Sequence, residues 1–555
     1  MPNSKLSRRI HPDRQLIYVS DPSNTTSQVS DPAKPEELRE IVRRYDELAN
    51  VDILVQEIWS QGWSHFWRSE NCRYDARPQH QRLIPMIDTG VMPLEVYIDE
   101  CHRRGITFVV GFRVNDRHGH NADWFEDLSQ THPDWILKGY KPSSPRTADH
   151  RSFDIGCALD YTVGAVRDWV LSIIQETASR FDIDGIELNW HRLPACFPLG
   201  KAASSHQLMT EYVHRIREML DEEGEAKGRR LLLGVRVLRD IESNRAMGLD
   251  VPTWVTEKLI DYVAPGDLGF TDPNAPLDEF VKLAHQNECA VYPQIQAKLG
   301  YHHRHVEQTP SHCRATIQNF YGAGADGYST QNIFDVEQYE TLRSLRDPEK
   351  VAAGDRHYVF YPLWGPSDGG QAGYGGDFPY APEEIKLDRA SEGNRQTFRF
   401  RIFEKLTGSD KAKLVFRADS LPGDILDVAI NGTRHMLELS KEKNAKFTFF
   451  SSSEVYGDPN PENIPTPEEY RGNVSTLGPR SCYDEGKRVG ETLCHIYQEN
   501  FGVSTNIIRP FNFYGPGMQE KDYRVLPNFG SRIKSQLPLK IYGRGNQTRT
   551  FLNIN

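Results

Sequence analysis

The sequence predicts an α/β protein that consists of a (βα)8 barrel, a small all-β module and a second, shorter α/β segment. Three observations predict this order. Short apolar runs alternate with amphipathic stretches up to about residue 348, glycine and proline then become dense, and an apolar run followed by a helical stretch returns near the C-terminus. At 555 residues the chain is also too long for one core, because single cores stop growing at roughly 250–300 residues. We therefore expect a tail over residues 1–15, a barrel over 16–348, an all-β module over 349–424 and an α/β segment over 425–555.

The first part of the chain carries eight apolar runs of strand length. Amphipathic stretches separate them, with apolar residues at helical spacing, such as Val166, Val170 and Ile173. Eight alternating units fit a TIM-like (βα)8 barrel. The expected strands cover residues 16–20, 51–58, 107–114, 185–190, 231–238, 259–263, 290–295 and 324–331.

One of these expected strands has polar residues at every second position. In residues 185–191 the polar members are Glu187, Asn189 and His191, and the apolar members between them are Ile186 and Leu188. Alternate side chains of a barrel strand face the axis, and apolar ones suit the outer layer that the helices cover. We therefore expect the polar set to face the barrel axis.

Two further strands repeat a Gly-x-Arg pattern that ends at Arg113 and at Arg236. If both arginines point inward, both guanidinium groups flank Glu187. A carboxylate in that setting stays ionised with a lowered pKa, which suits a nucleophile or part of an anion site better than a general acid. Two interpretations stay open: a structural ion network that fills the axis, or a site for an anionic glycan, such as one that carries uronate or sulfate.

A glycosidase needs two carboxylates about 5–10 Å apart, and Glu187 is one candidate. Exposed aromatic rings around a cleft bind sugar rings, and Trp190, at the end of a strand, is a candidate for this role. Together with residues 181–190 and 324–327, this layout resembles glycoside-hydrolase-like barrels with an appended β-domain, and the resemblance implies a glycan substrate. Four residues near strand ends compete for the second carboxylate, namely Glu57, Asp116, Asp240 and Asp267.

The middle of the chain changes character after residue 347. Glycine and proline are dense over residues 365–382, and residues 397–402 and 413–417 have the alternation of short strands. We expect a small all-β module of the sandwich type, before the α/β pattern resumes near residue 425.

The last part of the chain brings a serine, a tyrosine and a lysine into one pattern. Ser452 follows an apolar strand expected over residues 447–450, and Tyr483 and Lys487 lie four residues apart on one face of an expected helix. A lysine ammonium beside the phenol favours the phenolate, which can then act as a base near neutral pH. Taken alone, this spacing also fits an exposed helical pair.

Three longer strings surround these residues, at 453–459, 478–488 and 509–516. They resemble the nucleotide-sugar epimerase/dehydratase family of extended short-chain dehydrogenases, and within it most closely the UDP-glucuronate decarboxylases. The resemblance implies a partial Rossmann-type fold and oxidation of the sugar C4 hydroxyl by NAD, with Ser452, Tyr483 and Lys487 as the catalytic group. Tyr483 and Lys487 would also contact the cofactor.

The same resemblance assigns roles to further residues. Glu454 would be catalytic, whereas the neighbouring position 453 is a serine where dehydratases of the family have an aspartate. This difference disfavours elimination of water and is compatible with decarboxylation or epimerisation. Asn512, Arg524 and Arg549 would hold the substrate phosphates, since a guanidinium fork suits phosphate oxygens.

The resemblance covers only the catalytic half of that family. The other half begins with a strand and a Gly-x-x-Gly-x-x-Gly turn that opens a helix at the cofactor pyrophosphate. The literal match at Gly370, Gly373 and Gly376 has no apolar strand before it, and Pro379 follows where a helix should start. We therefore expect that this chain lacks the glycine-rich loop and both flanks of the fold, and that NAD binding is in doubt.

Charge and composition exclude several classes of binding partner. A net charge of −11 argues against nucleic acid or an anionic membrane, because both require a basic surface. The eight cysteines have no C-x-x-C pair, and the histidines at 118, 120, 302, 303 and 305 read as solvated loop residues, so no metal is expected. We expect a cytoplasmic protein that associates with itself through exposed strand edges.

Three functions stay open, and with them whether the chain is an enzyme. In the first, the chain is a glycoside hydrolase whose barrel is active and whose C-terminal segment has no catalytic part. In the second, the C-terminal segment forms a nucleotide-sugar enzyme together with another chain. In the third, the chain is a non-catalytic sugar-binding protein or a defective fusion product. The partner is accordingly a glycan, a nucleotide sugar or both.

Overall fold

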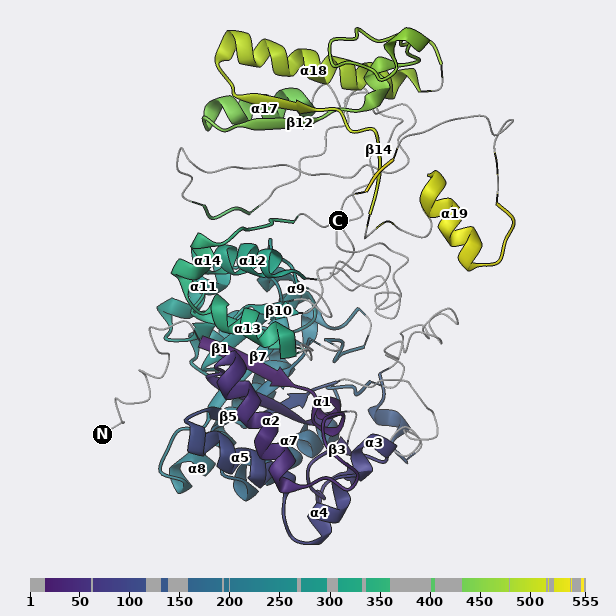
Figure 1. Ribbon diagram of the computed structural model, residues 1–555. Helices are drawn as coiled ribbons and strands as arrows, with labels where there is room; N and C mark the ends of the chain where they lie inside the picture. The colour runs from purple at the N-terminus through teal and green to yellow at the C-terminus, as the bar shows by residue number, and fades with distance from the viewer. Residues whose placement is uncertain are drawn as a thin grey trace. The chain divides into compact units, whose positions relative to one another are not determined.

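The computed structural model describes residues 15–60, 63–115, 131–137, 158–191, 194–198, 200–266, 271–296, 308–331, 336–359, 401–404, 432–478, 480–515, 518, 524–539, 541 and 551–553. The chain divides into two compact units, Met1–Glu404 and Lys405–Asn555 (Figure 1).

The first unit is a parallel barrel with eight strand positions. The ring closes because one segment pairs on both sides: β9 pairs with β8, and β10, three residues further, pairs with β11. All eight expected strands are present, which confirms the predicted barrel. In ring order the strands are β1 (Gln15–Ser20), β2 (Ile53–Ser60), β5 (Thr107–Arg113), β6 (Gly185–Asn189), β7 (Leu232–Leu238), β8 (Tyr262–Gly266), β9 (Ala290–Val291) with β10 (Gln294–Gln296), and β11 (Gly327–Gln331).

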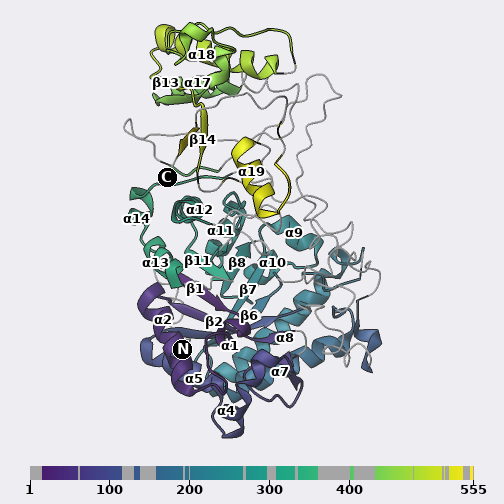
Figure 2. The same ribbon diagram turned by 45° about the vertical axis from the view of Figure 1, so that its right-hand side comes forward.

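Helices cover the outside of this ring (Figure 2). The second helix after β1 shows why they form where they do: α2 starts at Pro35, the Glu37 carboxylate accepts from the backbone of Lys34, and basic residues occupy the last turn. The longer helices are α2 (Pro35–Arg44), α5 (Pro93–Arg104), α7 (Gly164–Arg180), α8 (His206–Ala226), α11 (Asp278–Gln286), α12 (Pro310–Ala323) and α13 (Val336–Leu345). The shorter ones are α1 (Pro22–Thr26), α3 (Pro78–Gln81), α4 (Ile84–Asp88), α9 (Ile241–Ala246), α10 (Val251–Thr256) and α14 (Pro348–Ala353).

The strands divide their side chains between two layers. The large core between strands and helices takes residues such as Leu54, Val110 and Leu188, and a smaller apolar cluster inside the ring takes Ile17 and Val55. Two short strands, β3 (Trp63–Ser64) and β4 (Arg73–Tyr74), extend the sheet beside β2. Burial on both faces explains why the strands appear in the sequence as nearly continuous apolar runs.

The expected all-β module at 349–424 lies mostly outside the described residues and stays a prediction. Its first described residues belong to helix α14 and not to a strand. Residues 401–404 pack on the barrel: the Asn319 side chain donates to the Arg401 carbonyl at 2.7 Å, and the Phe403 ring lies against Gly322.

In the described residues of the second unit there are two small parallel strand pairs. The first pair, β12 (Phe447–Phe450) with β13 (Thr505–Ile508), packs against α17 (Thr433–Glu442) and α18 (Ser481–Phe501). This agrees with the expected α/β segment of partial Rossmann type. The remaining elements are β14 (Asn512–Tyr514) paired with β15 (Phe551–Asn553), the helix α19 (Val525–Lys534), and the 3-10 turns Ser453–Tyr456 and Pro461–Asn463.

A small core holds the helices on the first strand pair. It consists of Leu437, Phe449, Cys494, Tyr497 and Val503. Helix α18 approaches closely only because residue 490 is glycine, since a Cβ there would lie 2.3 Å from the Phe449 ring. Within the described part of the chain, no helix combines the length and apolar character needed to cross a bilayer.

Candidate functional sites

Polar and charged side chains fill the C-terminal half of the barrel axis, above the apolar cluster. The members from β6 are Glu187 and Asn189, and His191 follows them. All three are at most 1% exposed, whereas Ile186 and Leu188 belong to the core between strands and helices. The expected inward orientation of the polar set is therefore what the structure shows.

Glu187 forms a buried ion pair with Arg236 of the neighbouring strand β7. The Nε atom of Arg236 lies 2.9 Å from Oε1, and Nη2 lies 3.3 Å from Oε2. The Tyr262 hydroxyl donates to Oε2 at 3.1 Å. Burial first, and then the Glu187 charge, raise the pKa of Tyr262 well above its usual value, so the phenol keeps the proton that it donates.

Arg113 pairs with a different carboxylate. Its Nε donates to Glu57 Oε2 at 2.8 Å, and its Nη2 reaches both Glu57 and Asp21. The expectation that both arginines flank Glu187 is therefore corrected: Arg236 pairs with Glu187, and Arg113 pairs with Glu57 and Asp21. Arg113 lies in β5, between β2 and β6, and its side chain turns toward β2.

The glycine of each Gly-x-Arg pattern makes room for a neighbouring side chain. A Cβ at Gly111 would lie 2.9 Å from the Glu57 side chain, and one at Gly234 would lie 1.9 Å from the Tyr262 ring. Gly111 thus admits Glu57 from β2 and Gly234 admits Tyr262 from β8, and the arginine two residues later pairs with a carboxylate of a neighbouring strand. This is the physical reason for the repeated pattern.

His191 and Gln294 connect the two ion pairs. The Asn189 amide donates to Glu57 Oε1 at 2.9 Å, and its oxygen accepts from the His191 backbone. Gln294 Oε1 lies 3.0 Å from His191 Nδ1 and accepts from Arg236 Nη1 at 2.7 Å. Burial, and then Arg236, lower the pKa of His191 to about 3, so this imidazole is neutral at physiological pH.

This axial network favours a positioning role for its carboxylates. Glu187 is fully buried, and both of its oxygens have partners within the barrel. A nucleophile must reach the substrate, whereas a fully paired and buried carboxylate fixes the groups around it. Of the two interpretations of the axis, the geometry therefore favours the structural ion network.

The other predicted barrel residues that the structure describes lie outside the axial network. Asp240 starts helix α9, where its carboxylate accepts from the Ser243 backbone at 2.6 Å. Trp190 is fully buried in the outer core, 5.2 Å from the ring of Trp254. The expectation that Trp190 offers a surface to sugar is therefore corrected, because it lies on the helix side of the sheet. Outside the described residues lie Asp116, Asp267 and the histidines at 118, 120, 302, 303 and 305.

In the second unit the structure brings Lys487 close to the end of strand β12. The Lys487 ammonium donates to the Phe450 carbonyl at 2.8 Å and lies 5.7 Å from the centre of the Tyr483 ring. Burial lowers the pKa of Lys487. Ser452, two residues after β12, is buried, and its hydroxyl accepts from the Glu454 backbone at 3.2 Å.

The other predicted residues of this unit are peripheral to that group. The Glu454 carboxylate lies 3.4 Å from Arg480 at the start of α18, which connects the turn after β12 to the helix. Asn512 is an exposed residue of β14, and Arg524 is exposed at the start of α19. Arg549 and the glycines at 370, 373 and 376 lie outside the described residues.

Only part of a cofactor site can be assigned from these residues. Tyr483 and Lys487 lie four residues apart on α18 with the ammonium 5.7 Å from the ring centre, and their contact with a cofactor stays a prediction. Among the described residues of the second unit, no strand leads through a glycine-rich turn into a helix, so the pyrophosphate cradle is not assigned.

Four residues of the axial network escaped sequence reasoning: Asp21, Tyr262, Gln294 and Ser329. Ser329 accepts from Arg236 Nη1 at 3.0 Å. A signal for two of them exists in the sequence, since Gln294 alternates with Ile295 in β10 and Ser329 follows Tyr328 in β11. The same alternation that placed Glu187 inward could have identified both.

Residues 22–213 match Glycosyl hydrolase-like 10, and residues 412–555 match the NAD dependent epimerase/dehydratase family. UDP-glucuronic acid decarboxylase 1 of Xenopus tropicalis is 48% identical over 124 residues, which cover 22% of this chain and 29% of that protein. The protein of the same name from Arabidopsis thaliana is 46% identical over 134 residues, or 24% of this chain and 30% of that protein. The chain thus spans less than a third of the length of these relatives.

Among solved structures, UDP-glucuronic acid 4-epimerase from Bacillus cereus is 32% identical and covers 22% of this chain and 37% of its own, with a TM-score of 0.18. Alpha-L-fucosidase isoenzyme 2 from Paenibacillus thiaminolyticus is 14% identical and covers 60% of this chain and 49% of its own, with a TM-score of 0.40. By its family matches, the chain joins a glycoside hydrolase-like part to an epimerase-like part.

Proposed function

We propose that the barrel unit acts on carbohydrate as a glycoside hydrolase-like enzyme, with its substrate at the C-terminal end of the strands. The observation that carries this proposal is the position of the axial network, whose paired carboxylates hold the surrounding groups in place at the end of the barrel where enzymes of this fold have their active site. The match to a glycosyl hydrolase-like family supports it, because residues 22–213 include Glu57, Arg113 and Glu187.

In this proposal the two Glu–Arg pairs hold the floor of the substrate site. Asn189, His191 and Gln294 connect the two pairs through hydrogen bonds. Both guanidinium groups are engaged with carboxylates, which removes the argument for an anionic glycan in particular. We therefore propose a glycan substrate without a required negative charge.

The test is a screen of neutral and uronate-containing oligosaccharides with three matched variants, Glu187→Gln, Glu57→Gln and Glu100→Gln. Glu100 is also buried and paired with arginines, but it lies on the outer helix α5. We expect sugar release by the wild-type chain to fall at least tenfold in the two axial variants and to persist in Glu100→Gln. Equal release by all four proteins would exclude the axial carboxylates from the reaction.

A second candidate function rests on the second unit, where the Lys487 ammonium donates to the carbonyl at the end of β12 and lies beside the Tyr483 ring, and Ser452 follows the same strand. We propose that this group binds the 4-hydroxyl of a nucleotide sugar. NAD, when bound, would supply the hydride acceptor. Ser452 and Tyr483 would share the proton of that hydroxyl, and the Lys487 ammonium would stabilise the phenolate. Decarboxylation of a glucuronate or epimerisation is compatible with a serine at position 453.

Calorimetric titration of the full chain with NAD, and then with UDP-glucuronate, tests this second function. Binding that is lost in Tyr483→Phe/Lys487→Met and kept in Tyr497→Phe would support it, because Tyr497 lies on the same helix but in its small core. If neither ligand gives heat, the chain does not perform this chemistry alone.

We further propose that the chain is cytoplasmic and associates with itself. All seven cysteines that lie in the described residues, of eight in the sequence, are thiols, and five of them are buried, which fits a reducing compartment. Exposed apolar residues on β12 and β13, namely Phe450, Ile507 and Ile508, support association through this strand pair. Sedimentation of the wild-type chain against Ile507→Lys tests the association.

A further inference from the structure

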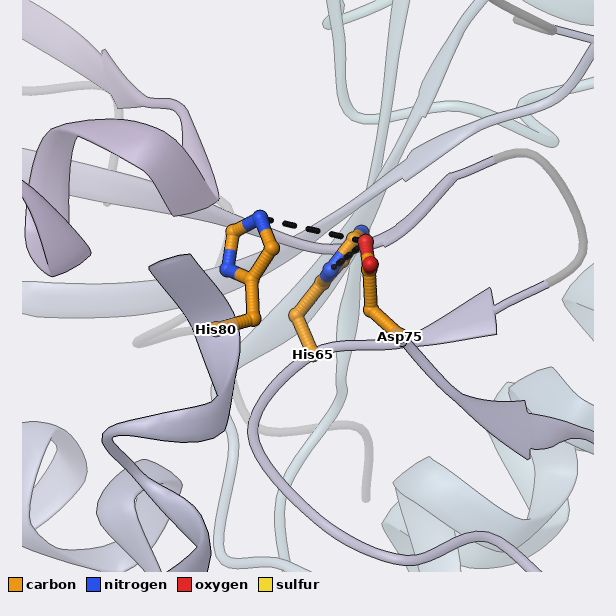
Figure 3. Close-up of side chains that lie close together, drawn as sticks. All are labelled: His65, Asp75 and His80. Atoms are coloured by element: carbon orange, nitrogen blue, oxygen red, sulfur yellow. Dashed lines mark ion pairs between the residues drawn. The ribbon is translucent and has the colours of Figure 1, made fainter. Parts of the chain in front are cut away.

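Two histidines and an aspartate meet beside strand β2, outside both sites described above. His65 follows β3, Asp75 follows β4, and His80 lies in the short helix α3 (Figure 3). All three side chains are buried, with 0% exposure for His65 and His80. One nitrogen or oxygen from each of the three lies within 4.8 Å of the other two.

The distances suit a single small metal ion. His65 Nδ1 lies 3.0 Å from Asp75 Oδ2, and His80 Nε2 lies 3.8 Å from the same oxygen. Tetrahedral zinc with ligands at 2.0–2.1 Å holds neighbouring ligand atoms about 3.3 Å apart. The two pairs with Asp75 lie on both sides of this spacing, and the two histidine nitrogens lie within 4.8 Å of each other, so side-chain rotations would bring the three atoms around one ion.

His80 lacks the hydrogen bonds that a buried imidazole normally makes. In the described part of the chain, neither of its ring nitrogens has a hydrogen-bond partner. Leaving such a group unsatisfied costs about 1–3 kcal/mol, and a metal ion would use one of the two nitrogens.

Arg77 provides the outer support that a metal-binding carboxylate usually has. Its guanidinium donates to both oxygens of Asp75, from Nε at 3.0 and 2.9 Å, and its backbone donates to Oδ1 at 2.8 Å. These contacts fix the carboxylate with Oδ2 toward the two histidines. Asp21, the partner of Arg113, acts electrostatically on both imidazoles and partly offsets the Arg77 charge.

We propose that His65, Asp75 and His80 form a binding site for one zinc-class transition-metal ion, with a fourth position open to water. The site would join residues 65–80 into one rigid loop at the end of strand β2, the strand that carries Glu57. Two imidazoles and one carboxylate form a ligand set typical of zinc with an open position.

The first test is metal analysis of the full chain, purified without a histidine tag from zinc-supplemented medium. We expect one equivalent of zinc per chain in the wild type, at least a fivefold lower content in His80→Gln, and no change in His285→Gln. His285 is a matched control, because it also pairs with a carboxylate, Asp326 at 3.0 Å, on the surface. Absence of metal from the wild type, or equal metal in all three proteins, would overturn the proposal.

A second measurement covers the case in which His80→Gln does not fold. The wild-type chain is stripped with chelator, and Co²⁺ is then added. We expect the strong visible absorption of four-coordinate cobalt and a higher Tm, and both should persist in His80→Cys, which keeps a ligand at this position. A wild-type chain that shows neither change would also overturn the proposal.

Discussion

Replacement of Glu187 by leucine should strongly destabilise the barrel unit. The change leaves Arg236 buried without its carboxylate, at a position with 0% exposure, and removes the acceptor of the Tyr262 hydroxyl. Removal of one partner of a buried pair costs about 3–5 kcal/mol. The double variant Glu187→Leu/Arg236→Met removes both charges, and Ser329 keeps its bond to the Tyr292 carbonyl. We expect the double variant to lie within about 2 kcal/mol of the wild type.

The assay is urea unfolding followed by tryptophan fluorescence. All nine tryptophans precede residue 365, so the signal reports on the barrel unit alone. The coupling free energy between the two substitutions should be at least about 2 kcal/mol and of the sign that restores stability. A single variant that loses less than 1 kcal/mol, or a double variant that loses the sum of both singles, would refute the reasoning.

Three further predictions concern the same two units. Because the pKa of His191 is lowered in the folded state, its contribution to stability is present above pH 6.5 and is progressively lost as the pH falls toward 3. Between pH 7.5 and 5 the free energy of unfolding in urea should therefore fall by about 2 kcal/mol more in the wild type than in His191→Gln. Equal losses would contradict the assigned pKa. Gly234→Ala should cost about 3 kcal/mol, because its Cβ would overlap the Tyr262 ring, whereas Gly164→Ala meets only an ordinary contact at 3.8 Å and should cost less than 1 kcal/mol by the same assay. In the second unit, Gly490→Ala should lower the free energy of unfolding by about 2 kcal/mol and speed amide hydrogen exchange in helix α18, since the new methyl group would push the helix away from the Phe449 ring. Unchanged exchange would show that the helix can shift freely.

The barrel could be predicted because its strands are buried on both faces. Continuous apolar runs then stand out, and so does a strand such as β6 that interrupts them with Glu187 and Asn189. The inward orientation followed from the alternation of side chains alone. That alternation also places Trp190 outward, so its burial was predictable from the residues that surround it.

The pairing within the axis could not be predicted in the same way. Arg113 lies between two neighbouring strands, and the choice of Glu57 over Glu187 depends on the side-chain conformation and on Asp21, which follows β1 and caps helix α1. The histidine cluster at 65 and 80 has no characteristic spacing. It forms because β3 and β4 pair and bring Asp75 beside His65.

The closing segment of the barrel has a consequence for its dynamics. In residues 290–296, β9 pairs with β8 at only two positions and β10 pairs with β11 at only three. Pro293, between β9 and β10, has no N–H group to donate a further hydrogen bond. The ring should therefore open first at this seam during local unfolding, with faster amide exchange there than in β5 to β7. Gln294 lies on the seam and contacts both His191 and Arg236. Transient opening would thus admit water directly to the charged axis, and the seam would act as the entrance to the most tightly buried part of the molecule.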